Sequence, residues 1–322
     1  MKRVRTAIAA AMFYLFLLPT GVQAAELLIP GGQIVGLQLE NDTVTVAAFD
    51  DALGQNARKS GLQIGDELLT INGTPVRSAE DVRCCLDASE ADVTLTIARK
   101  GRQHALRITP KLTDEGKKLG IYLKQGIAGI GTITWYDPQT HVFGTLGHGV
   151  NDGRGKLLRM TQGTAFHAQV MSIKKGTCGE PGQLKGSAET FRPWGTLLRN
   201  TAQGVFGTTT EPFSGKAIPI ADYDEVHTGK ASIRCAVENG SVQEYSVDII
   251  KIYPQDRPDN RNFLLKVTDP ALLAATGGIV QGMSGSPILQ NGRIVGAVTH
   301  VLVNSPDTGY GIFIENMLEA AS

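Results

Sequence analysis

One stretch near the start of the chain decides the fold of the N-terminal part: Gly61-Leu62-Gln63-Ile64-Gly65-Asp66-Glu67-Leu68-Leu69-Thr70-Ile71-Asn72-Gly73. Its apolar segment, Glu67–Ile71, has the length of a short strand. The Asn72-Gly73 pair that follows is typical of a tight turn. A helix is predicted from Ser78 to about Asp87, because Ser78 can cap its first turn and the next acidic residues favour the positive end of its dipole.

Short strand signals surround this stretch at regular spacing. The predicted strands are Val35–Leu39, Val44–Ala48, Glu67–Ile71, Val93–Arg99 and Ala105–Thr109. The order strand, Gly-Leu-x-x-Gly-Asp, strand, Asn-Gly turn and capped helix resembles a PDZ domain, which we place at residues 27–112. In that family an extended peptide adds a strand to an open sheet edge. The resemblance implies that the peptide binds at Gly36, Leu37, Gln38 and Leu39.

The rest of the chain also consists of short apolar runs separated by glycine turns, without alternation of strands and long helices. An all-β sandwich or barrel is therefore expected. The predicted strands are Ile127–Trp135, Ala231–Val237, Ser246–Ile252, Phe263–Val267, Ile294–Val303 and Gly309–Ile314.

A nucleophile motif lies in this second region, at Gly282-Met283-Ser284-Gly285-Ser286-Pro287. Glycines on both sides of Ser284 permit the sharp bend that presents a serine hydroxyl to a substrate. A nucleophilic serine also needs nearby N–H groups to stabilise the oxyanion of the tetrahedral intermediate. By similarity to the chymotrypsin-like arrangement, these would be the amides of Gly282 and Ser284.

The serine requires a general base, and the chain has six histidines. His148 lies between two glycines after a predicted strand, which favours an imidazole at a loop edge with room for close approach. His300, in a predicted strand after Ser284, is the alternative base. The other four are expected to be surface residues: His104, His141, His167 and His227.

The second region is similar to the SpoIVB serine-peptidase family (stage IV sporulation protein B type). Four segments carry the resemblance, and the last is the most specific: Trp135–His148, Lys174–Gly182, Gly229–Ile252 and Thr268–His300. The resemblance implies a chymotrypsin-like double β-barrel at residues 119–322 and a triad of His148, Asp269 and Ser284. Asp137 and Asp152, nearer His148 in the chain, remain alternatives to Asp269.

The N-terminus has the pattern of an export signal. Lys2, Arg3 and Arg5 precede the apolar run Ala7–Leu18, which is too short to span a bilayer as a helix. Residues 1–24 are therefore predicted to be a signal peptide or a retained membrane anchor, and the protein is expected outside the cytoplasm. The family's role implies regulated proteolysis during sporulation, in which the enzyme cleaves the extracytoplasmic part of an envelope protein and also itself.

Composition and cysteine content exclude other classes of function. The 322 residues carry 31 basic and 31 acidic side chains, so a global positive field for binding nucleic acid is absent. The four cysteines form no metal-binding spacing, and neither a metal nor an organic cofactor is expected. A Cys178–Cys235 disulfide remains open, since export permits one. The alternative function is a catalytically silent PDZ adaptor in the cell envelope.

Overall fold

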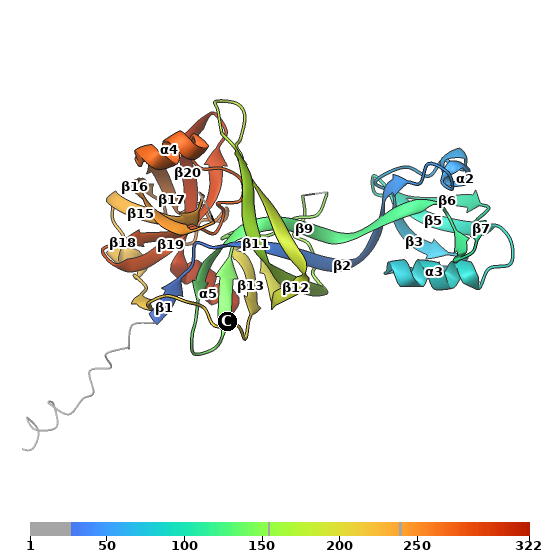
Figure 1. The fold of residues 1–322 in the computed structure, drawn as a ribbon, viewed down its shortest axis with the longest axis horizontal. Helices are drawn as coiled ribbons and strands as arrows, with labels where there is room; N and C mark the ends of the chain where they lie inside the picture. The colour runs from blue at the N-terminus through green and yellow to red at the C-terminus, as the bar shows by residue number, and fades with distance from the viewer. Residues whose placement is uncertain (1–26, 154, 238–239) are drawn as a thin grey trace, which may run out of the picture.

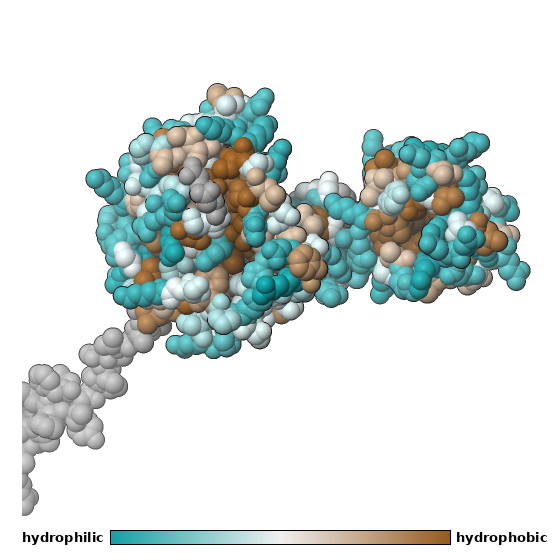
Figure 2. Space-filling view, in the orientation of Figure 1, coloured by the Kyte–Doolittle hydropathy of each residue, from teal (hydrophilic) through white to brown (hydrophobic). Residues whose placement is uncertain are grey.

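A computed structural model describes residues 27–153, 155–237 and 240–322. The fold is mainly β, as predicted. A large body holds two β-barrels, and a smaller module is attached to it through two long strands (Figure 1). The space-filling view has the same outline, with a narrow waist between the two bodies (Figure 2). The predicted signal or anchor at residues 1–24 lies outside the described residues. No helix among the described residues has the length and apolar character needed to cross a membrane.

The first barrel is a closed ring of six antiparallel strands. Each strand pairs with the next, and the last pairs with the first because β2 also pairs with β9. Its interior is filled by aliphatic and aromatic side chains that include Leu37, Phe143 and Trp194. In spatial order the strands are β9 (Ile121–Tyr136), β10 (Val142–Thr145), β13 (Gly204–Thr208), β12 (Gln183–Thr201), β11 (Gln162–Lys174) and β2 (Ile34–Phe49).

The second barrel is also closed and six-stranded, which confirms the predicted double-barrel class. Its core is built around Phe263, Ile288 and Phe313. The strands in spatial order are β15 (Gly229–Ala236), β16 (Val242–Ile252), β17 (Phe263–Val267), β20 (Ser305–Phe313), β19 (Arg293–Leu302) and β18 (Pro287–Gln290). Two helices accompany it, α4 (Pro270–Thr276) and α5 (Ile314–Ala321).

The smaller module has its own apolar core, to which Val82, Leu86 and Leu95 contribute. Its clearest helix begins as the sequence predicts, because the Ser78 hydroxyl accepts a hydrogen bond from the Asp81 amide in a capping box. The elements are α2 (Gln55–Lys59), β3 (Glu67–Ile71), β4 (Thr74–Pro75), α3 (Ala79–Asp87), β5 (Val93–Arg99) and β6 (Arg102–Ile108). A hairpin of β7 (Lys111–Thr113) and β8 (Gly116–Lys118) follows them.

The module is inserted between two neighbouring strands of the first barrel. The first half of β2 pairs with β9 and β11 in the barrel, whereas Val44 and Thr45 pair with β3 in the module. The strands pass from one body to the other where their register shifts and where Gly126 has a φ of 74°. A Cβ at Gly126 would lie 1.9 Å from the Leu39 carbonyl oxygen, so only glycine fits this crossing.

The predicted start of the PDZ domain at residue 27 therefore needs correction. Residues 27–39 belong to the first barrel, because β1 (Leu27–Pro30) and the start of β2 pair with β9 there. The sequence analysis grouped these residues with the strands that follow them in the chain. Their actual partner, β9, comes only after the inserted module. The short strand β14 (Ile218–Pro219) and the 3₁₀ helix η1 (Tyr223–Glu225) lie on the connection to the second barrel.

The four cysteines are all free thiols. Cys178 is exposed in the β11–β12 hairpin, whereas Cys235 is fully buried in the core of the second barrel. The alternative of a Cys178–Cys235 disulfide is thus not realised in this structure.

Candidate active site

The nucleophile motif folds into a tight turn immediately before β18. The Met283 amide donates to the Val280 carbonyl at 3.1 Å, and the Ser286 amide donates to the Met283 carbonyl at 2.9 Å. Gly282 and Gly285 have φ values of 99° and 96°, in the region that favours glycine. The turn leaves the Ser284 hydroxyl at the surface of a cavity, where it donates to the Thr299 carbonyl at 2.8 Å.

The backbone amides of Gly282 and Ser284 donate no hydrogen bond to any residue that the structure describes. Their carbonyl groups, by contrast, are held by Thr132 of β9. The Thr132 amide donates to the Ser284 carbonyl at 3.0 Å, and the Thr132 hydroxyl donates to the Gly282 carbonyl at 2.8 Å. The peptide groups that carry these two N–H groups are held through the carbonyls of Gln281 and Met283, which accept from the Leu184 amide at 2.8 Å and the Ser286 amide at 2.9 Å. Both N–H groups are therefore available to an oxyanion beside the hydroxyl.

Nothing in the sequence marks Thr132 as part of the site, because it lies in an ordinary strand 150 residues before Gly282. Its own carbonyl accepts a hydrogen bond from the Thr145 hydroxyl at 2.6 Å. Thr145 ends β10, three residues before His148. A chain of hydrogen bonds therefore connects the Ser284 turn in the second barrel with the His148 loop in the first.

His148 lies in the loop after β10, as predicted. Leu146 and Gly147 have φ values of 70° and 66°, so the backbone turns sharply just before the imidazole. Its Nδ1 lies 3.0 Å from the Gly149 carbonyl oxygen, which only accepts, so Nδ1 carries the proton and Nε2 is left as the basic nitrogen. Burial lowers the pKa of His148 below its usual value, and this hydrogen bond partly opposes the shift.

His148 and Ser284 line the same cavity, which has a volume of about 340 Å³. Each comes from a different barrel, so the cavity lies where the two barrels meet. A second cavity of about 390 Å³ lies beside His148 and is lined by His300 and Asp259. The structure thus brings together three of the predicted catalytic residues: His148, Gly282 and Ser284.

His300, the alternative base, lies next to His148 with the two ring centroids 5.0 Å apart. Desolvation, together with the positive charge of protonated His148, lowers the pKa of His300 to about 4. His300 lines the second cavity and does not line the one that contains Ser284. It therefore lies beside His148 but outside the cavity that contains Ser284.

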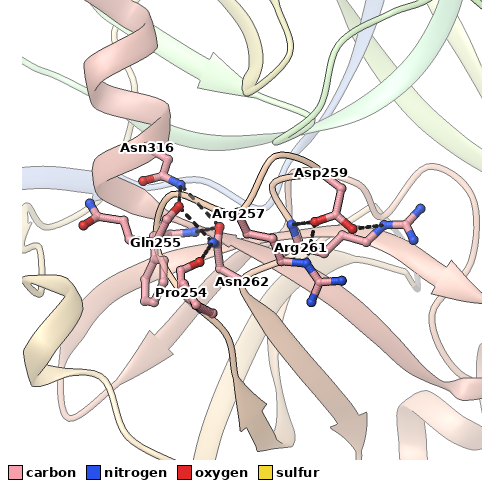
Figure 3. A network of polar contacts seen from close by, with 8 residues as sticks. Pro254, Gln255, Arg257, Asp259, Arg261, Asn262 and Asn316 are labelled. Carbon is pink, nitrogen blue, oxygen red and sulfur yellow. Dashed lines mark hydrogen bonds and ion pairs between the residues drawn. The ribbon is translucent and has the colours of Figure 1, made fainter.

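Asp259, which the sequence analysis did not single out, lies in the β16–β17 loop at the edge of the second cavity. Arg257 forms an ion pair with its carboxylate at 2.7 Å, and Arg261 lies 4.0 Å from it (Figure 3). The same loop is anchored by Asn262, whose amide donates to the carbonyls of Pro254 and Gln255. These contacts hold the loop in place opposite His148.

Asp269, the predicted triad acid, has a different position. It is the N-cap of α4, where its Oδ1 accepts hydrogen bonds from the Ala271 and Leu272 amides at 2.9 and 3.1 Å. Its Oδ2 accepts from the Ser246 amide at 3.2 Å. Asp269 lines neither cavity around His148. The assignment as triad acid is therefore wrong for this structure, because an Asp-Pro pair at this spacing also forms a helix start.

The two alternatives to Asp269 also accept hydrogen bonds from backbone amides close to them in the chain. Asp137 accepts from the Gln139 amide at 2.8 Å within the β9–β10 turn. Asp152 accepts from the Lys156 amide at 3.0 Å. The group that orients the His148 ring is instead the Gly149 carbonyl.

A substitution at Asp269 distinguishes a cap from a catalytic acid. Asp269→Asn keeps an N-capping oxygen, so we expect wild-type kcat and nearly wild-type stability. Asp269→Ala removes the cap and should lower the free energy of unfolding by about 0.5–2 kcal/mol, with little change in kcat. Denaturant unfolding and peptide cleavage measure the two effects. If Asp269→Asn lowered kcat by roughly 10⁴-fold, as in a triad, the cap assignment would be overturned.

The predicted peptide-binding residues Gly36, Leu37, Gln38 and Leu39 are not in the PDZ module. They lie in the barrel part of β2, paired with β11 on one side and β9 on the other. A strand with both edges paired has no free backbone groups for an added peptide. The assignment is therefore wrong, since a Gly-Leu-x-Leu segment suits any buried β-strand equally well.

Three of the four remaining histidines are exposed, as predicted: His104, His141 and His227. His167 differs, because it is half-buried and its Nε2 lies 2.9 Å from a Glu211 carboxylate oxygen. Among the described residues, no group of three histidine, cysteine or acidic side chains is arranged to hold a metal ion.

The sequence profile of the SpoIVB peptidase S55 family matches residues 115–318, which is more than half of the chain. The chain belongs to the SpoIVB peptidase S55 family. The part matched to the S55 family contains His148, Thr132 and the Ser284 turn. A PDZ-domain profile matches residues 52–99, within the inserted module. Both predicted resemblances are confirmed. The chain is a member of a serine-peptidase family, and it also carries a PDZ domain.

This member of the S55 family is also similar to individual proteins. A protein of Rhizobium meliloti (strain 1021), named as a candidate zinc metalloprotease, is 34% identical over 100 residues, and the match spans 31% of this chain and 26% of that relative. The active form of the Rv3671c protease from M. tuberculosis is 14% identical, with a TM-score of 0.38 over 61% of this chain and 73% of that one. The HtrA-type protease AlgW with a decapeptide is 12% identical, with a TM-score of 0.38 over 72% and 62%.

Proposed function

We propose that this protein is a serine endopeptidase that uses Ser284 as its nucleophile and His148 as its general base. The observation that carries the proposal is the convergence of these two side chains, from separate barrels, on one cavity beside two backbone amides that have no partner among the described residues. A serine, a histidine and a pair of oriented N–H groups are the parts that acyl transfer needs.

In the proposed reaction, the Ser284 hydroxyl leaves the Thr299 carbonyl and bonds to the peptide carbonyl carbon, while its proton passes to His148 Nε2. The Gly282 and Ser284 amides stabilise the oxyanion. When the intermediate collapses, the C–N bond breaks and His148 returns the proton to the leaving amine. Water then hydrolyses the acyl-enzyme by the same route. The Gly149 carbonyl supplies the orientation that a triad acid provides in other serine peptidases.

The PDZ module supports a protein or peptide as substrate. In its sheet, β6 and the first residues of β9 (Ile121–Lys124) each have one edge without a partner among the described strands. A peptide could add a strand at either edge. The β9 edge is favoured, because the same strand continues into the first barrel and carries Thr132 of the site.

We further propose export and a role in envelope signalling. The positively charged start, apolar run and small residues of the first 24 residues support export. The resemblance of the chain to the SpoIVB family supports cleavage of the extracytoplasmic part of a regulatory membrane protein, in sporulation or a related envelope response. It also supports cleavage of the enzyme by itself.

Covalent labelling tests the catalytic assignment directly. A fluorophosphonate probe should label the purified full chain at Ser284, and mass spectrometry of the tryptic peptide locates the adduct. His148→Ala should strongly slow the labelling, because the hydroxyl loses its base. Adduct formation at another serine, or equal labelling rates in both proteins, would contradict the proposed roles.

The pH profile should reveal the lowered pKa of His148. Only neutral His148 can accept the serine proton, so kcat/KM should fall as the pH decreases through that pKa. Because burial lowers the pKa of His148 below 6.5, we expect the half-maximal rate below pH 6.5 and a plateau above it. His300→Gln should retain this acid limb, since His300 titrates at about 4. A midpoint above pH 7 would refute the assignment.

A further inference from the structure

The cavity that contains Ser284 has a strongly apolar wall. Its volume of about 340 Å³ is at the small end of ligand-binding sites, which suits a single side chain better than a long segment. Of its lining residues only His148 is titratable, and none is an acid, a lysine or an arginine. The wall is formed by aliphatic side chains of the first barrel and its loops: Leu37, Leu39, Ile127, Ile130, Leu146 and Val150.

A glycine of β9, Gly129, lines the cavity and leaves space beside the strand. Gly129 pairs with Leu37, and a Cβ placed at Gly129 would meet no heavy atom within 4 Å. Gly131, two residues along the same face, is covered instead, because its Cβ would lie 2.3 Å from the Leu146 side chain. Open space therefore lies beside Gly129, which is itself exposed, and this position lines the same cavity as His148 and Ser284.

The position of the aliphatic wall indicates which side of the scissile bond would contact it. The acyl part of a substrate binds to Ser284 and to the two amides of the second barrel. The amine leaves next to His148, which the first barrel provides. The residue that carries the leaving amine must therefore lie against the first barrel, where the aliphatic wall is.

We propose that this cavity binds the apolar side chain of the residue on the amine side of the scissile bond, an inference that rests on the proposed peptidase function. A charged side chain would lose its hydration there without gaining a partner. Large aliphatic or aromatic residues should therefore be cleaved faster than glycine at this position, by roughly 10- to 200-fold in kcat/KM.

The test uses the full chain and a random peptide library. After digestion, mass spectrometry identifies the new amino-terminal residues, which report the amine side directly and require no known substrate. The wild-type products should begin mainly with Leu, Ile, Met or Phe. Gly129→Leu fills the open space, so its products should shift toward Gly, Ala and Ser.

Ala128→Leu is the matched control. It places the same side chain at the neighbouring position of the same strand, but Ala128 does not line the cavity. It should keep the wild-type profile, and fluorophosphonate labelling counts the competent Ser284 in each preparation.

Two outcomes separate the inference from the function. Wild-type cleavage that depends on Ser284 but shows no preference for new amino-terminal residues would overturn the cavity's role alone, as would identical profiles for the two leucine variants. The absence of any Ser284-dependent cleavage would overturn the peptidase function, and the cavity's role with it.

Discussion

Replacing Ser284 by alanine is expected to lower kcat by on the order of 10⁴-fold or more, because no other group can form the acyl-enzyme. The fold should survive. Ser284 is only partly buried, and its hydroxyl makes one hydrogen bond, to the Thr299 carbonyl, so the free energy of unfolding should change by about 1 kcal/mol or less. Library digestion measures the rate, and thermal unfolding measures the stability.

Ser286→Ala provides the control for this experiment. Ser286 lies two residues further in the same turn and is fully buried, with its hydroxyl beside the Cys235 thiol and outside the cavity that Ser284 lines. Its removal should leave kcat close to the wild-type value. If Ser284→Ala retained normal cleavage, the nucleophile would have to be another residue and the proposed function would fail.

The second large effect is expected for Gly285→Ala. A Cβ at Gly285 would lie 2.0 Å from the Thr132 carbonyl oxygen and 2.6 Å from the Leu146 amide nitrogen, both backbone atoms that cannot move aside easily. The residue also has a φ of 96°, which an alanine rarely adopts. The turn would have to shift, and the Gly282 and Ser284 amides would leave their positions beside the substrate oxygen. We expect kcat to fall by roughly 10²- to 10³-fold, the cost of losing an oxyanion donor.

Gly153→Ala is a suitable comparison, because its Cβ would meet nothing within 4 Å. It should retain both kcat and melting temperature, whereas Gly285→Ala should lower both. Circular dichroism tests whether the variant still folds, and fluorophosphonate labelling tests whether the remaining molecules react. A folded Gly285→Ala protein with wild-type kcat would show that the contact between Thr132 and the turn does not position the oxyanion site.

Much of the local structure could be predicted from the sequence. The helix that starts after Ser78, the strand Glu67–Ile71 and the turn around Ser284 are confirmed. Each depends on residues that are neighbours in the chain, so hydrophobic periodicity, capping and glycine placement are sufficient evidence. The position of His148 at a sharp turn followed from its flanking glycines in the same way.

The errors concern partners that are distant in the chain. Asp269 and the segment Gly36–Leu39 were assigned because the sequence resembles two known families, but their roles depend on what lies next to them in space. A carboxylate before a proline can cap a helix or support an imidazole, and the local sequence is the same in both cases. A strand can offer a free edge or be paired on both sides, which only the sheet topology determines.

The sequence alone determined that the chain combines a PDZ module with a serine-peptidase region, and it predicts Ser284 and His148 as the reactive pair. Only the tertiary structure decided that the module interrupts the first barrel, that Thr132 binds the carbonyls of the Ser284 turn, and that Gly129 lines the cavity beside it. The physical reason is the range of the interactions. Turns and caps form between residues close in the chain, whereas the two-barrel site depends on contacts between residues 150 or more positions apart, such as Thr132 and Gly282.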